Sequence, residues 1–267
     1  MKKSSLKRIF SFALAAVTAL SLAALPADQA FAADNKGLRI KASFPKVSSL
    51  DKAWDNSKAT TRFAVAPKTK TSYKSGSSLT YTVYIPQDVL SKKGAEVAVD
   101  GYVDVNTAYE ENGYIGVIIP KSSYTLSYDG SEVNVYGWNG QDEKEMTVAQ
   151  VKKSTKLTEV GEYYKFTVKN TAFSKNGYIP DGEEQNHSIS ELSTSEKYYF
   201  VPGVNITVAA KQAISGEYVY VDDIKFKAAD TISFDFSKKT YEWADGATNG
   251  KDGVKAELKT IATDSVK

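Results

Sequence analysis

The sequence predicts an all-β protein, an antiparallel β-sandwich of the jelly-roll type with few short helices. Tyrosine is abundant, with 17 residues, and valine and threonine accompany it in runs where apolar and polar side chains alternate. Gly, Pro, Asn, Asp and Ser separate these runs. Alternation is typical of half-buried strands, and the separating residues favour turns. Many short strands with little helix favour two packed antiparallel sheets.

Each predicted element is a short run bounded by turn residues. Strands are predicted at 37–44, 61–66, 77–85, 96–105, 113–119, 132–136, 163–169, 199–209 and 217–227. Short helices are predicted at 49–55 and at 87–92, the second directly after Pro86. Proline favours the start of a helix and cannot continue one. Residues 146–153 fit either a strand or a helix.

The predicted strands group into one domain at residues 33–228. After Phe226 the chain passes through a short polar stretch into "ISFDF" at 232–236, as though a new unit began. Residues 229–267 are too few for an independent sandwich. We expect them to be a linker with part of a second module, or strands added to the first domain.

Residues 1–32 have the pattern of a secretory signal peptide. Lys2, Lys3, Lys7 and Arg8 precede an apolar stretch from Ile9 to Leu25, and Ala30-Phe31-Ala32 fits the small-x-small cleavage site. An uncleaved membrane anchor is the alternative, although no second apolar segment supports it. The sequence therefore predicts a secreted protein that begins near Ala33.

The composition of the mature chain excludes several function classes. The leader carries four of the 34 Lys and Arg and one of the 32 Asp and Glu, which leaves 30 against 31. This balance gives no electrostatic reason to expect nucleic acid or a membrane surface as a partner. There is no cysteine, so thiol catalysis and thiolate metal sites are excluded. His187 is the only histidine and lies in a polar stretch, which disfavours a Ser-His-Asp triad.

Two adjacent aspartates interrupt the apolar strand "YVYVDDIKF" at 218–226. Strict alternation places Asp222 on one face with Ile224 and Phe226, and Asp223 on the opposite face toward water. An isolated buried carboxylate is costly, so Asp222 must be hydrogen-bonded, neutralised or bound to a cation. A structural calcium site built from oxygen ligands and a set of backbone N–H donors are both compatible with the sequence.

Aromatic residues flanked by polar side chains are candidates for ligand contact. An aromatic ring can pack on the C–H face of a sugar while nearby amides and carboxylates bond to its hydroxyls. Each ring could equally be part of the core. The candidates are Trp54 in "DKAWDN", Tyr102, Tyr109 and Tyr114 around "NTAYEENGY", and Trp138, Asn139 and Gln141 in the turn-like "YGWNGQDE".

No catalytic residue can be assigned from the sequence. A glycosidase needs two carboxylates about 5 to 9 Å apart. The adjacent acid pairs 110–111, 142–143 and 183–184 lie in polar, loop-like stretches that indicate solvated side chains. No P-loop, dinucleotide-binding, nucleophile-elbow or zinc-hydrolase motif is present.

Three stretches resemble the jelly-roll carbohydrate-binding modules attached to secreted bacterial polysaccharide hydrolases. They are "SGSSLTYTVYIP" at 75–86, "GEYVYVDDIKF" at 216–226 and "FDF…W" at 234–243. Within this group, "YTVYIPQDVL" and the tryptophan-bearing turns resemble the mannan-binding modules of β-mannanases. The resemblance implies that Asp222 is a ligand of a structural calcium and that exposed Trp and Tyr are sugar platforms. The opening strand "LRIKASF" lacks the acidic residue that often shares this calcium.

The sequence thus predicts a secreted, non-catalytic module that adsorbs to a β-linked plant polysaccharide, with mannan-type glycans favoured. An appended or partner glycoside hydrolase would be kept near its substrate. Two alternatives stay open: the N-terminal portion of a glycoside hydrolase such as a β-mannanase, and a cell-surface structural or interaction domain.

Overall fold

The computed structural model describes residues 36–54, 56, 59–65, 67–91, 94–108, 113–140, 142–180, 189–236 and 256–260. Residues 33–267 form one compact unit. The predicted signal peptide lies outside the described residues, as do Tyr109, Gln141, His187 and Trp243. Among the helices of the described ranges, none is long and apolar enough to cross a membrane.

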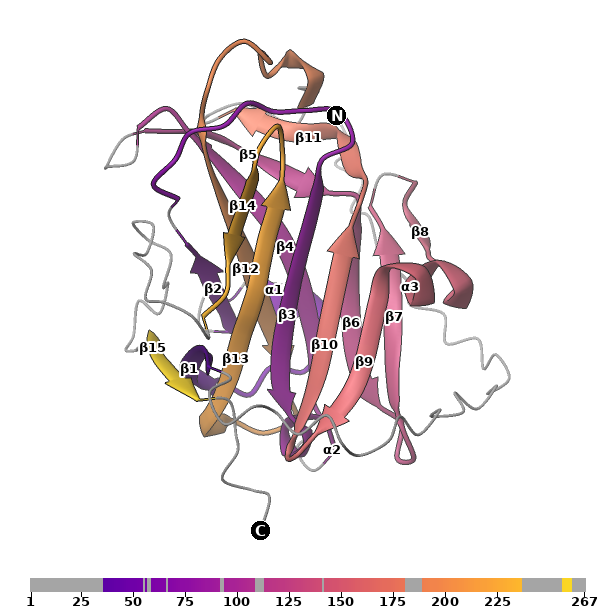
Figure 1. The fold of residues 1–267 in the computed structure, drawn as a ribbon. Coiled ribbons are helices and arrows are strands. Elements are labelled where there is room, and N and C mark those ends of the chain that lie inside the picture. Colours follow the sequence, from indigo (N-terminus) through magenta and orange to yellow (C-terminus); the bar gives the residue numbers. More distant parts are fainter. Residues whose placement is uncertain are drawn as a thin grey trace, which may run out of the picture. The chain divides into compact units, whose positions relative to one another are not determined.

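Two antiparallel sheets make up the fold, which confirms the predicted all-β sandwich (Figure 1). In sheet A the strand order is β15 (Ala256–Thr260), β1 (Lys36–Phe44), β13 (Ile214–Lys227), β3 (Ser78–Pro86), β10 (Tyr163–Asn170) and β9 (Thr155–Val160). β14 (Thr231–Phe234) also pairs with β13. Two elements of the 229–267 segment, β14 and β15, are therefore strands of sheet A. The domain boundary after residue 228 stays a prediction.

In sheet B the strand order is β11 (Phe173–Pro180), β5 (Tyr114–Pro120), β4 (Glu96–Asn106), β6 (Ser122–Tyr128), β7 (Val133–Asn139) and β8 (Lys144–Glu145). β12 (Tyr199–Ala209) pairs with the other edge of β4 and with β2 (Thr60–Ala64). β5 and β6 follow each other along one edge of β4, with Val103 opposite Ile118 and Val97 opposite Leu126. β4 is therefore paired along both of its edges and lies in the middle of sheet B, which has a broad outer face.

The core lies between the two sheets and is formed by alternate residues of their strands. Tyr81 and Val83 of β3, Val97 and Val99 of β4 and Phe166 of β10 are among its fully buried side chains. The ring of Phe200 in β12 packs against that of Phe226 in β13, with 5.4 Å between ring centroids. Burial of this large apolar surface is the main source of stability for a protein without disulfides.

The predicted helices at 49–55 and 87–92 are present as α1 (Leu50–Trp54) and α2 (Gln87–Ser91). The ambiguous segment at 146–153 is the helix α3 (Val148–Ser154). Thr147 caps its N-terminus, because the Thr147 side chain accepts from the Gln150 amide while the Gln150 side chain accepts from the Thr147 amide. A short 3-10 helix, η2 (Ile189–Glu191), precedes β12.

Candidate functional site

A β-bulge interrupts β13 at the two adjacent aspartates. Asp222 lies opposite Thr82, and Lys225 lies opposite Thr80. Two residues of β13, Asp223 and Ile224, therefore lie opposite a single residue of β3, Tyr81. Asp223 occupies the left-handed region at φ 52°. This conformation is uncommon for a residue other than glycine, and aspartate and asparagine tolerate it better than most. The bulge therefore changes which residues share a face.

The prediction that Asp222 shares a face with Ile224 and Phe226 is wrong. Because of the extra residue, Val219 and Val221 before the bulge face the core together with Ile224 and Phe226 after it. Asp222 instead lies with Thr82 on the outer face of sheet A. Strict alternation could not reveal this, because the sequence gives no sign of the bulge beyond the Asp-Asp pair itself.

Asp222 is nevertheless only 3% exposed, as predicted, whereas Asp223 faces solvent. The Oδ1 atom of Asp222 accepts hydrogen bonds from the backbone amide of Asp223 at 2.8 Å and from that of Phe236 at 3.4 Å. The predicted backbone donors are thus present. The segment that follows β14 supplies one of them.

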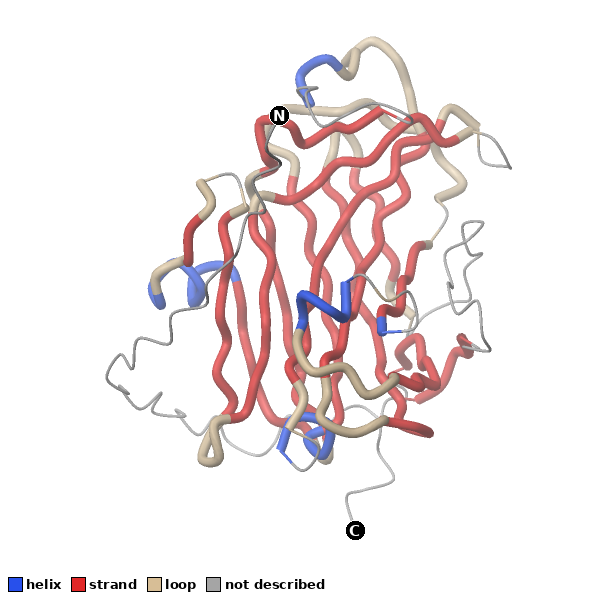
Figure 2. Tube along the Cα trace, turned by 180° about the vertical axis from the view of Figure 1, so that it is seen from behind, coloured by secondary structure: helices blue, strands red, loops and turns tan. Residues whose placement is uncertain are grey.

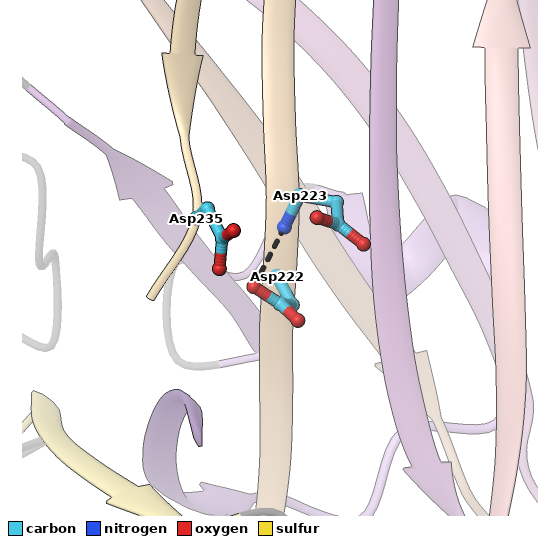
Figure 3. Close-up of side chains that lie close together, drawn as sticks. All are labelled: Asp222, Asp223 and Asp235. Carbon is cyan, nitrogen blue, oxygen red and sulfur yellow. Dashed lines mark hydrogen bonds between the residues drawn. The ribbon is translucent and has the colours of Figure 1, made fainter. Parts of the chain in front are cut away.

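Asp235 joins the two aspartates of the bulge in an acidic cluster (Figure 3). One carboxylate oxygen from each of Asp222, Asp223 and Asp235 lies within 4.8 Å of the other two. The pKa of Asp222 is raised to about 7, mainly by burial, with the negative charge of Asp223 as the next contribution and that of Asp235 as a smaller one. The two amide hydrogen bonds act in the opposite direction and lower the pKa. The cluster offers a cation three hard oxygen ligands.

Calcium fits this donor set in chemical type. It takes six to eight oxygen ligands, so the three carboxylates would be joined by carbonyl oxygens or water. Asp235 is an additional acid beside the bulge, whereas the opening strand "LRIKASF" contains none. The sequence pattern missed Asp235 because it lies beyond the predicted end of the module, in "FDF".

A second candidate site lies on the outer face of sheet B. Tyr136 of β7 is opposite Thr125 of β6, which is opposite Ala98 of β4. Directly opposed residues share a face of an antiparallel sheet. Ala98 belongs to a small cluster with Leu50 and Ala53 of α1, separate from the core between the sheets. Tyr136 therefore lies on the outer face of sheet B, the face that α1 partly covers (Figure 2, helix near the centre of the view).

The outer face of sheet B and the helix α1 that partly covers it carry three accessible aromatic side chains. Tyr136 is 54% exposed, and Trp138, two residues along β7 on the same face, is partly exposed. Trp54 ends α1 and is 45% exposed. Trp138 lies within a strand and not in the predicted turn. Tyr136 is not among the ligand residues predicted from the sequence, although the spacing in "YGW" places both rings on one face of a strand.

The other predicted ligand residues differ in their surroundings. Tyr102 is only 5% exposed and packs with Ala64 and Val201, so it offers little ring surface to a ligand. Tyr114 is 41% exposed at the start of β5. The Asn139 side chain donates to the carboxylate of Asp142 at 2.9 Å and accepts from the Asp142 amide at 3.2 Å, which holds the turn after β7.

Polar groups lie beside the aromatic ones on the outer face of sheet B. Asp100 of β4 lies between Ala98 and Tyr102 on this face and opposite Asn205 of β12. Both Asp100 and Asn205 are half-buried. The face thus combines exposed rings with amide and carboxyl groups, which is the combination expected for a sugar-binding surface.

Comparison of the chain with family models, with curated proteins and with solved structures finds no match.

Proposed function

We propose that this protein is a secreted, non-catalytic carbohydrate-binding module that adsorbs to a β-linked plant polysaccharide, with mannan-type glycans favoured. The observation that carries the proposal is the pair Tyr136 and Trp138, two accessible rings on one face of β7. Trp54 on the helix that partly covers the same face adds a third ring. Soluble proteins rarely expose neighbouring large aromatic side chains without a binding role.

The mechanism is adsorption without bond chemistry. The rings stack on the C–H faces of successive sugars, and the polar groups beside them select the hydroxyl pattern. An appended or partner glycoside hydrolase is thereby held near its substrate, and the gain is one of effective concentration. The leader pattern at residues 1–32 supports the extracellular setting that this requires.

The acidic cluster supports a structural calcium ion in the same protein. Asp222, Asp223 and Asp235 would hold it, and the ion would join the bulge of β13 to the segment after β14. Neutralising three close carboxylates removes a repulsion that otherwise opposes folding. Calcium would therefore stabilise the module without taking part in sugar recognition.

The distance between the carboxyl groups on the outer face of sheet B does not support a glycoside hydrolase activity. Asp100 and Asp104 share this face of β4, but four residues along a strand separate their backbones by roughly 13 Å. Glycosidase carboxyl groups lie about 5 to 9.5 Å apart. Asp142 and Glu143 are both exposed in a turn, as the sequence predicted.

Affinity electrophoresis tests the proposal directly. The mature chain is run through gels that contain soluble mannan, xylan, β-glucan or xyloglucan, and through a gel without polysaccharide. Retardation in the mannan gel, abolished in a Y136A/W138A double variant, is the expected result. Migration unchanged in every gel would refute binding, and release of reducing sugar by the purified chain would show an enzyme instead.

A further inference from the structure

Asp100 occupies a position where a carboxyl group is energetically unfavourable. No hydrogen bond or ion pair within the described part of the chain engages its side chain. Burial raises its pKa to about 7, and no hydrogen bond from a described residue offsets this effect. The group retains some contact with water, yet protein atoms surround it closely enough to disfavour the charged form. A carboxyl kept at a cost to stability is more typical of a binding site than of a scaffold position.

The register places Asp100 in line with the exposed rings. β4 and β6 pair up to Val99 opposite Tyr124, so one residue further along Asp100 is level with Ser123. Ser123 in turn lies opposite Trp138. Since neighbouring strands are about 4.8 Å apart, the backbones of Trp138 and Asp100 are about 10 Å apart across the sheet.

Asn205 continues this line on the other side of Asp100. It lies opposite Asp100 on β12, and like Asp100 it has a half-buried side chain with no hydrogen bond inside the described structure. An amide and a carboxyl side by side provide both donors and acceptors for hydroxyl groups. A chain of sugars that stacks on Trp138 and runs across the strands would pass over both polar groups.

We infer that Asp100 and Asn205 are the hydroxyl-recognising pair of this face and that they determine which glycan the module accepts. The inference rests on the proposed function, since it assigns specificity within the same binding surface. The aromatic rings supply stacking energy that depends little on which sugar is bound. The two polar groups reject sugars whose hydroxyls leave them unpaired, because an unpaired buried polar group is costly.

Protonation of Asp100 is coupled to binding in this arrangement. A neutral glycan that covers the carboxyl removes its remaining water, which favours the protonated form further. The bound state then takes up a proton, and affinity decreases as the pH rises through about 7. The other charged positions on this face are Asp104 on β4, Glu145 on β8, Asp51 and Lys52 on α1, and Arg62 on β2, whose side chain lies outside those described.

Three variants test the pair: D100N, D100A and N205A. Isothermal titration with soluble mannan, xylan and β-glucan oligosaccharides is performed at pH 5.5 and pH 8.5, alongside Y136A. D100N keeps the size of the side chain and removes its charge, and thermal unfolding confirms that each variant folds. At pH 8.5 the unfolding temperature of D100N is expected to exceed that of the wild type, because a disfavoured charge has been removed.

The expected result is a change of selectivity. D100A and N205A lower the affinity for the preferred glycan at least tenfold and reduce the ratio of this affinity to those for the other glycans. Y136A lowers the affinity for every glycan by a similar factor. Wild-type affinity decreases between pH 5.5 and pH 8.5, and D100N abolishes this decrease. If D100A and N205A bind glycans as the wild type does while Y136A loses affinity, the role of Asp100 and Asn205 in specificity is refuted and the proposed function stands. If the wild type binds no glycan at either pH, both are overturned.

Discussion

The backbone amide of Phe236 donates a hydrogen bond to Oδ1 of Asp222, a residue 14 positions earlier in the chain, across 3.4 Å. This bond fixes the segment after β14 to the bulge of β13. It also brings Asp235, the residue before Phe236, to the two aspartates of the bulge. Three carboxylates thereby meet where the bulged strand and the end of β14 join, and their repulsion has to be balanced.

Calcium is expected to stabilise the protein through this cluster. Added at about 100 times its dissociation constant, it should contribute about 2.7 kcal/mol, which corresponds to a rise in Tm of roughly 5 to 10 °C for a protein of this size. Differential scanning calorimetry in EDTA and in calcium measures the effect. D235N should reduce it strongly, whereas E145Q, which changes an exposed acid on β8, should leave it unchanged. Equal Tm values for the wild type with and without calcium would exclude the site.

Asp223 is expected to be unfavourable for the calcium-free protein. Its charge raises the pKa of Asp222, and D223N removes that charge while asparagine tolerates the same left-handed conformation. In EDTA at pH 8, D223N should therefore unfold at a temperature a few degrees above that of the wild type. In calcium the order should reverse, because a ligand has been lost. A D223N variant that is less stable in EDTA would show that Asp223 has a structural role independent of charge.

Most of the fold could be predicted from alternation, because strands such as β3, β4 and β12 have one face in the core and contain the expected apolar residues. The strands that were missed have weaker signals. β6 is "SSYTLSY", rich in serine, and β11 is "FSKNGYIP", interrupted by Asn-Gly, a pair that usually marks a turn. β9 contains Lys156 and Glu159, and β14 is only four residues long and lies between two aspartates. These segments form strands because they pair with neighbouring strands of the sheet, and this pairing cannot be read from the sequence alone.

The site was less predictable than the fold, since it depends on long-range register. The two aspartates of "YVYVDDIKF" indicated an unusual position, but the bulge and the approach of Asp235 arise from pairing with β3 and β14. Similarly, Trp54 and Trp138 could be suspected from their polar neighbours. That α1 and β7 place them over the same sheet face follows only from the strand order β7-β6-β4-β12.

Gly101 is expected to be essential for the packing of Tyr81. A Cβ atom at Gly101 would lie 2.5 Å from Cε1 of Tyr81 and 2.7 Å from a methyl carbon of Leu79, which is closer than these atoms can approach. Because Tyr81 is fully buried, it cannot move aside. G101A should therefore lower the free energy of unfolding, measured in urea, by about 1 to 3 kcal/mol. G140A is the control, since its Cβ would meet no atom closer than 3.9 Å. Equal costs for the two variants would contradict tight packing of Tyr81 on β4.

The exposed tryptophans should report the bound glycan. Trp54 is 45% exposed and Trp138 is partly exposed, so iodide is expected to quench their fluorescence in the free protein. A glycan that stacks on Trp138 should protect that ring from iodide, and W138A should remove the protected fraction and lower affinity about tenfold, or about 1.4 kcal/mol. W54F separates the contribution of α1 from that of β7, because it keeps a ring while removing the indole signal. Protection that persists in W138A and disappears in W54F would move the primary contact from β7 to the helix.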